Sequence, residues 1–256
     1  MSPLPVETAA DTKYMRPLRL AGQLIMENGG ETFRAEETIV RMGQAFGLDE
    51  VESFAVPSGL FLSYRRLDGS TETGVYRVRR AGTNLTRVDE VNRISRAVAD
   101  GKMDCEAATA ALEAIRGERS AGHAAAKIFM AGVCAGGFCL MFGGGLTDTL
   151  TATLVTALVQ ALTLLLERFH LQALVATLSG ALLSALLPLL CARLYPARID
   201  AVIAGSLMPL LPGLAMTNAV QDTMRGDMVS GLSHGIQAIL TAGLVAGGAL
   251  IAQNLI

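Results

Sequence analysis

The sequence has no tryptophan, and aromatic residues make up only 5% of its 256 residues. Charge is missing from most of the second half. The basic residues after Lys127 are Arg168, Arg193, Arg198 and Arg225, and the acidic ones are Asp148, Glu167, Asp200, Asp222 and Asp227. Before that point basic and acidic residues nearly balance, whereas nucleic-acid-binding domains carry a clear excess of positive charge. We therefore expect no nucleic-acid partner.

Signatures of enzyme chemistry are also lacking. None of the four cysteines forms a CxxC pair, and three lie in apolar runs, which favours small buried side chains over redox or metal chemistry. Gly29-Gly30 ends a helical pattern instead of following a strand, so it does not predict a phosphate loop. Glu36 and Glu37 diverge by about 100° around a helix, which favours a solvated face over a hydrolytic pair. We expect no catalytic residue, no metal and no cofactor.

Residues 14–118 predict a soluble α+β domain in the order ααβββαα, with helices on one face of a small antiparallel sheet. Apolar residues recur every three to four positions in the expected helices and alternate in the expected strands. Thr32 is the expected N-cap of the second helix. The helices are expected at 14–28, 32–46, 86–99 and 104–116, and the strands at 51–56, 60–66 and 75–80. We expect residues 1–13 to be disordered and residues 119–127 to form a linker.

Residues 128–256 predict a membrane domain. A helix that crosses the hydrocarbon core needs about 20 mostly apolar residues. The stretches of suitable length without a formal charge are 128–145, 149–166, 171–192, 201–221 and 228–256. A chain of 26.8 kDa has too few polar residues to cover five such surfaces in water. The expected fold is therefore a membrane α-helical bundle of about five transmembrane helices after the α+β domain, with the lipid bilayer as its surroundings.

Small residues are frequent in the first and last of these spans, where they let helix backbones approach closely. Gly243 and Gly247 stand four apart, as in a GxxxG face. We favour ordinary packing inside one bundle over a dimer interface and leave a homo-oligomer open.

The expected orientation places the soluble domain in the cytosol, since Met1 to Arg19 is polar and does not resemble a cleavable leader. Five spans then put the carboxyl terminus outside, together with Arg193 and Arg198. That position opposes the tendency of basic residues to remain inside.

One segment of the fourth span departs from a simple lipid-facing helix. Pro209 and Pro212 remove backbone donors and predict a break, which membranes tolerate where it lines a cavity. A second half-helix starting near Pro212 would point free N–H groups at a substrate carboxylate. The candidate substrate-binding residues are Pro209, Pro212, Gly213, Thr217, Asn218, Gln221 and Asp222.

Several polar residues near the spans have more than one interpretation. Asp222 is favoured as an interfacial carboxylate at a helix end over a group that accepts a proton or pairs with Arg225. Asp148 is favoured as an N-cap over an ion ligand. For His234 an interhelical hydrogen bond is favoured over a proton relay.

Two regions of the chain resemble the threonine/serine exporter family. The first is GQLIMENGGETFRAEETIVRMGQAFGLDEVESFAVP at residues 22–57, followed by NLTRVDEVNRISRAVADG at residues 84–101. The second is Leu211-Pro212-Gly213 with Thr217, Asn218 and Gly226-Asp227. The resemblance covers nearly the whole chain.

The resemblance implies a particular function and partner. Members are either one fused chain or two subunits, and this chain looks like the larger subunit of the split form, whose second component is a short membrane protein. Fused members export threonine and serine, and split members are associated with dicarboxylates such as succinate. The implied function is export of a small carboxylate-bearing metabolite across a bacterial inner membrane.

Other functions remain open from the sequence. The chain lacks a Walker motif, so transport would be driven by an ion gradient or by the substrate gradient. One alternative is a membrane-anchored enzyme whose soluble domain does the chemistry, and another is a regulatory subunit whose soluble domain binds a metabolite. The enzyme alternative does not explain why the chain would need five spans, since one would anchor it.

Overall fold

The structure is a computed structural model that describes residues 13–66, 68–79, 82–117, 124–168, 173–193, 196 and 198–255. The chain divides into two compact units. The first unit consists of residues 1–119 and 217–234, and the second of residues 120–216 and 235–256. The expected disordered terminus lies almost entirely outside the described residues, as do residues 119–123 of the expected linker, whereas its residues 124–127 are helical.

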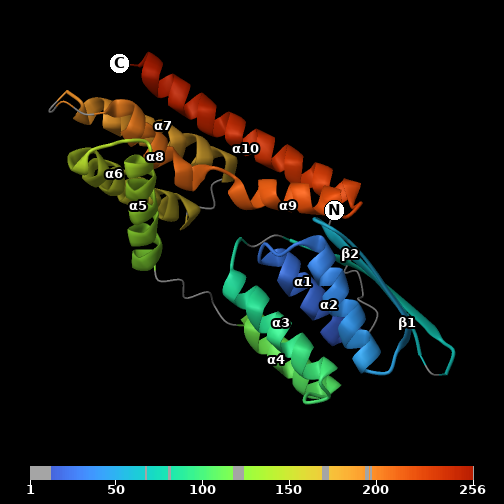
Figure 1. Ribbon diagram of the computed structural model, residues 1–256. Coiled ribbons are helices and arrows are strands. Elements are labelled where there is room, and N and C mark those ends of the chain that lie inside the picture. The colour runs from blue at the N-terminus through green and yellow to red at the C-terminus, as the bar shows by residue number, and fades with distance from the viewer. Residues whose placement is uncertain are drawn as a thin grey trace, which may run out of the picture. The chain divides into compact units, whose positions relative to one another are not determined.

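The first unit contains the predicted α+β elements in the predicted order (Figure 1). They are α1 (Met15–Glu27), α2 (Thr32–Ala45), β1 (Asp49–Val56), β2 (Gly59–Arg65), β3 (Thr71–Arg77), α3 (Leu85–Ala99) and α4 (Cys105–Gly117). The strands form one antiparallel sheet in the order β1-β2-β3. The helices and the sheet share a single apolar core.

The third strand was predicted with bounds that lie a few residues too late in the chain. It begins at Thr71 instead of residue 75, because Arg65 pairs with Thr71 directly after a tight turn. Gly69 provides the positive φ of that turn, and the Asp68 side chain accepts hydrogen bonds from the Ser70 backbone and hydroxyl. The first residues of β3 are polar and at least partly exposed. They lack the alternating apolar residues that identify a strand, so the sequence resembled a loop there.

The sheet has one covered face. In β2 the side chains of Leu60, Leu62 and Tyr64 are buried, and α1 and α2 pack on that side (Figure 1). On the opposite face Phe54, Phe61 and Val75 lie in register across the strands and are exposed. The alternation of strand side chains accounts for both faces.

The apolar half forms long helices, as predicted. They are α5 (Ala124–Met141), α6 (Leu146–Arg168), α7 (Ala173–Cys191), α8 (Ile199–Leu207), the 3-10 turn η1 (Met208–Leu210), α9 (Gly213–Met224) and α10 (Met228–Asn254). Four of them, α5, α6, α7 and α10, are long and apolar enough to cross a membrane. The pair formed by α8–η1 and α9 makes a fifth candidate, bent by 57°. Most of their large apolar side chains are exposed, as lipid-facing surfaces require.

Glycines set the close helix contacts inside the second unit. A side chain at Gly205 of α8 would meet the Ala135 carbonyl oxygen and the Cys139 backbone nitrogen of α5, and one at Gly248 of α10 would meet the α7 backbone. Gly243 and Gly247 have open space around them instead. The expectation that this GxxxG pair packs within the bundle is therefore wrong, because the neighbouring Gly248 makes the contact.

Polar contacts at one end of the second unit involve Arg198, whose position opposed the charge rule. Its guanidinium donates to the Gly143 carbonyl oxygen at 2.5 Å, and its backbone N–H donates to Asp148 Oδ1 at 3.2 Å. The other Asp148 oxygen accepts from the Gly145 N–H at 2.9 Å. Asp148 was expected as an N-cap, but Gly145 holds that place and Asp148, in the first turn of α6, bonds back to it.

The glycine contact on α5 can be tested directly. We expect Gly205→Ala to lower thermal stability in detergent by an amount equivalent to about 1–3 kcal/mol, because the added methyl group would strike backbone atoms that cannot rotate away. Gly137→Ala in α5, where a methyl group meets nothing, is the control and should be neutral or slightly stabilising. Equal unfolding midpoints for both variants would contradict the close approach.

A buried polar cluster at the turn between α9 and α10

The predicted break in the fourth span is present. Helix α8 ends at Leu207, η1 follows, Leu211 is extended, and α9 starts at Gly213, one residue after Pro212 (Figure 1). Pro209 lies inside η1. These positions belong to the second unit.

The other predicted site residues belong to the first unit. Asn218 and Asp222 share one face of α9, as their spacing predicted, and both are fully buried. Thr217 is exposed and Gln221 is half-buried, so they lie on a different face. The seven predicted residues are thus distributed over two units, and the buried cluster is built around Asp222 with partners from α2 and α10.

Asp222 is held by two side chains that are distant in sequence. Its Oδ2 lies 2.9 Å from His234 Nδ1 on α10, and its Oδ1 accepts a hydrogen bond from the Thr32 hydroxyl at 3.1 Å. His234 and Thr32 are buried as well. A buried carboxylate needs such partners, since an unpaired charge without water is very costly. The favoured interhelical hydrogen bond of His234 is therefore confirmed.

Thr32 is the residue that the sequence placed in the wrong role. Glu31 occupies the N-cap position of α2, and Thr32 is the first helical residue. Its hydroxyl lies 3.1 Å from Asp222 and 3.2 Å from Asp227 Oδ2. A hydroxyl has one proton to donate, so Thr32 can serve only one of the two carboxylates at a time. A threonine at the start of a helical pattern is typical of an N-cap, which is why the sequence predicted that role. The sequence contains no signal for a partner 190 positions away.

The chain around Asp222 makes a tight turn. Gly226 has a φ of +88°, and the Asp227 N–H donates to the Asp222 carbonyl oxygen at 2.9 Å, which closes the end of α9. Arg225 does not pair with Asp222 through its side chain, because its guanidinium lies 3.4 Å from the centre of the Phe33 ring. The Asp222–Arg225 ion pair, which the sequence left open as an alternative, is therefore not formed.

Further polar groups from the α+β domain border the cluster. Glu36 of α2 accepts a hydrogen bond from the Ala55 N–H at 2.6 Å, and the Ser230 hydroxyl donates to the Ala55 carbonyl oxygen at 3.4 Å. The Asn218 amide donates to the Gly29 carbonyl oxygen at 3.5 Å. Glu36 was expected on a solvated face, but it is partly buried.

Burial and nearby acids decide the protonation of Glu36. Desolvation raises its pKa above the usual 4.5, and the negative charges of Asp227 and Asp222 raise it further, whereas the Ala55 N–H opposes the shift. The cluster thus combines three carboxyl groups with one histidine. No group of three or more such side chains among the described residues has the geometry of a metal site.

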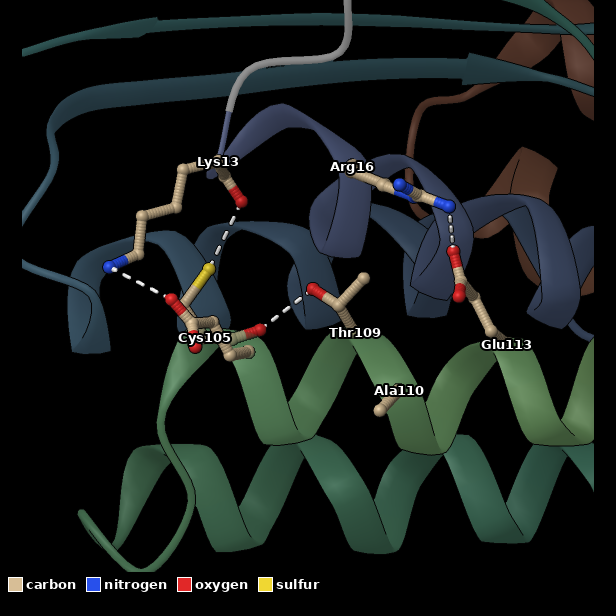
Figure 2. Close-up of a pocket in the computed structure, with 7 residues that line it drawn as sticks. Lys13, Arg16, Cys105, Thr109, Ala110 and Glu113 are labelled. Atoms are coloured by element: carbon tan, nitrogen blue, oxygen red, sulfur yellow. Dashed lines mark hydrogen bonds and ion pairs between the residues drawn. The ribbon is translucent and has the colours of Figure 1, made fainter.

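A second polar region lies between α1 and α4 at the surface of the same unit (Figure 2). The Cys105 thiol donates to the Lys13 carbonyl oxygen at 3.1 Å, and Arg16 forms an ion pair with Glu113. Burial raises the pKa of Cys105, which keeps the thiol protonated and weakly nucleophilic. This pocket has paired charges and no activated nucleophile, so it does not resemble a catalytic site.

These observations define a class of protein. Several long helices expose apolar surfaces suited to lipid, one candidate span is broken at two prolines, and a buried Asp–His pair lies at the end of that span. This combination is typical of multi-pass membrane transport proteins.

Comparison with known proteins identifies the family. Residues 18–256 match the family described as putative threonine/serine exporter. The chain therefore belongs to the threonine/serine exporter family and is a membrane transport protein that exports small metabolites. The resemblance found in residues 22–57, 84–101 and 211–227 is confirmed.

Two relatives cover most of the chain. This chain is 27% identical over 231 residues to the probable succinate transporter subunit YjjP of Klebsiella aerogenes. The alignment covers 85% of this chain and 84% of the relative. The chain is 25% identical over 230 residues to the protein of the same name from Escherichia coli strain K12, with 86% of each chain covered. No solved structure matches the chain.

The raised pKa of Glu36 predicts how stability depends on pH. The folded state holds the proton of Glu36 to higher pH than the unfolded state, so its contribution to stability is complete below about pH 4.5 and is lost as pH rises through the raised value. Over that range, the unfolding midpoint in detergent should fall less steeply in Glu36→Gln than in the wild type, because glutamine does not ionise. The glutamine oxygen can still accept the hydrogen bond from the Ala55 N–H. Glu37→Gln, on the exposed side of α2, should match the wild type. Identical pH profiles of wild type and Glu36→Gln would contradict the assignment.

Proposed function

We propose that this chain is the larger subunit of a secondary exporter for small carboxylate-bearing metabolites, either threonine and serine or dicarboxylates such as succinate. The second component would be a separately encoded small membrane protein in the same bacterial inner membrane. Both relatives are named as subunits of a transporter, and five spans in one chain leave no equal second half for a site between repeats.

The observation that carries the proposal is the buried Asp222–His234 pair. A carboxylate oxygen and an imidazole nitrogen 2.9 Å apart share a hydrogen bond, and histidine is a common proton carrier in proteins. Ionisable residues inside membrane segments commonly mark proton and substrate pathways. The pair therefore couples export to proton movement, with Thr32 shifting between Asp222 and Asp227 when the charge on Asp222 changes.

The carboxylate of the substrate would not bind among these acids, because like charges repel. The positive end of α9 at Pro212 and Gly213 is better suited, since the first N–H groups of a helix attract negative groups. Pro209, Pro212, Gly213, Thr217, Asn218 and Gln221 stay predictions for the substrate path, and Asp222 becomes the proposed proton site.

We infer the membrane topology from contacts inside the first unit. The turn between α9 and α10 packs against α2, so this turn and the α+β domain lie on the same side of the membrane. An even number of crossings must separate them. Helices α5, α6 and α7 supply three, and α8–η1–α9 supplies the fourth if it crosses completely instead of re-entering. We place this side in the cytosol, where an exporter takes up its substrate.

The proton role is tested by neutral isosteres. We expect Asp222→Asn and His234→Gln to reduce the initial efflux rate at least about tenfold, because each removes a group that must carry the proton. Efflux of labelled threonine, serine and succinate from proteoliposomes that contain both subunits is the measurement. Asp200→Asn, an exposed acid at the start of α8, should retain wild-type efflux. Normal efflux by well-folded Asp222→Asn would remove this residue from the mechanism.

The requirement for a second subunit is a separate prediction. Proteoliposomes with this chain alone should show no specific counterflow of any of the three solutes, and adding the small membrane subunit should restore it. Specific flux through the purified chain alone would overturn the two-component proposal.

A further inference from the structure

Three buried hydroxyl groups in the second unit have no hydrogen-bond partner. They belong to Thr156 of α6, Ser184 of α7 and Ser206 of α8, and their side chains are at most 4% exposed. Buried polar groups in folded proteins are almost always paired, so each exception among the described residues needs an explanation.

Other hydroxyls in the same spans behave differently. In a membrane helix a serine or threonine can donate to the carbonyl oxygen four residues earlier and so satisfy itself. This bond is made by the hydroxyls of Thr149, Thr151, Thr153, Thr163, Ser179 and Thr241. The three buried hydroxyls do not make this bond to their own helix. The six hydroxyls that make it belong to residues that are only partly buried. Their position inside the bundle distinguishes them.

Packing places the three hydroxyls at one level of the bundle. Above them, a Cβ added at Gly180 of α7 would lie 3.7 Å from side-chain carbons of both Val159 of α6 and Leu210 of η1, so the three positions are neighbours. Below them, Ala152 of α6 groups with Val202 of α8, while Ala185 of α7 groups with Ile203 of α8. Helices α6 and α8 thus run parallel and α7 runs opposite.

Each hydroxyl lies between these two levels. Thr156 falls between Ala152 and Val159, Ser184 between Gly180 and Ala185, and Ser206 between Ile203 and Leu210. Their spacings of three or four residues keep Thr156 and Ser206 on the faces that make the contacts on both sides, and Ser184 on the face of Gly180. We call Thr156, Ser184 and Ser206 the hydroxyl layer.

Two prolines add acceptors at the same level. Pro188 has no N–H, so the Ser184 carbonyl oxygen lacks its usual donor four residues later. Pro209 does the same to the carbonyl oxygen of Gly205, the neighbour of Ser206. A hydroxyl without a partner and a carbonyl without its helical donor therefore occur together on α7 and again on α8. Chance defects in packing would not be expected to coincide twice.

We propose that the hydroxyl layer is a solute-binding site within the export pathway, and that the solute bound there has no net charge. The residues 152–159, 180–185 and 202–210 that surround the layer include no charged side chain. Hydroxyl and carbonyl groups can bond the ammonium and carboxylate groups of a zwitterion, whereas a dianion would remain without a countercharge away from water. A zwitterionic amino acid is therefore the favoured solute over a dicarboxylate. This inference rests on the proposed export function and narrows its substrate class.

Accessibility of the layer can be measured without any transport. In a chain whose four cysteines are replaced by alanine, Thr156→Cys, Ser184→Cys and Ser206→Cys should react in native membranes with a small hydrophilic methanethiosulfonate. Ala185→Cys, in a buried apolar cluster, should not react. L-Threonine or L-serine near neutral pH should slow the reaction, and succinate should not. Unreactive cysteines at all three positions would overturn the site, and protection by succinate alone would overturn the assignment of a solute without net charge.

Transport kinetics give the second test. With both subunits in proteoliposomes, Thr156→Val, Ser184→Ala and Ser206→Ala should each raise the apparent KM for threonine or serine efflux roughly fivefold, as expected for one lost hydrogen bond. Unfolding midpoints should not fall, because the wild-type hydroxyls have no partner to lose. The controls are Thr163→Val and Ser179→Ala, which remove hydroxyls that bond their own helix. Both control variants should keep the wild-type KM.

The two proposals fail in different ways. If wild-type proteoliposomes show no flux, the export function is wrong, and the labelling result still decides whether the layer is open to polar solutes. If the wild type transports and all three variants keep its KM, the hydroxyl layer is wrong and the export function stands.

Discussion

The structure depends on one requirement, that polar groups within apolar surroundings find partners without the help of water. Asp222 shows it most clearly. This carboxylate is fully buried, and His234 and the Thr32 hydroxyl bond its two oxygens. Removing either partner would leave a buried charge or acceptor unsatisfied, at a cost that exceeds the gain from a typical surface interaction. The contact fixes the turn between α9 and α10 to helix α2.

The same requirement separates two kinds of hydroxyl in the spans. Those on partly or fully exposed faces bond the carbonyl of their own helix, so the bundle can meet lipid without unpaired groups. Those of Thr156, Ser184 and Ser206 do not, and two prolines leave carbonyls at the same level without helical donors. In the two proposals, protons bind at Asp222 and a solute without net charge binds among the hydroxyls. Proton binding and substrate binding would then occur at two different places in the chain.

Much of the fold could be predicted because its signals are local. The order of the α+β elements, the apolar spans and the break after Leu207 all follow from periodicity, length and proline chemistry. Errors arose where the signal was weak or shared. Polar β3 residues resembled a loop, and Gly243 and Gly247 matched a packing motif although Gly248 makes the contact. Asn218 and Asp222 were correctly placed on one face of α9, since helical spacing alone decides it.

The sequence by itself determined that residues 128–256 need lipid, because segments of that length and hydropathy cannot be covered by the polar residues available. Only the tertiary structure decided the partners of Asp222. Thr32 precedes it by 190 positions, and a hydroxyl at a helix start is compatible with a cap or with a distant carboxylate. Likewise each unpaired hydroxyl is an ordinary serine or threonine in the sequence. Side-chain partners across such separations depend on how the helices pack, which no local pattern encodes.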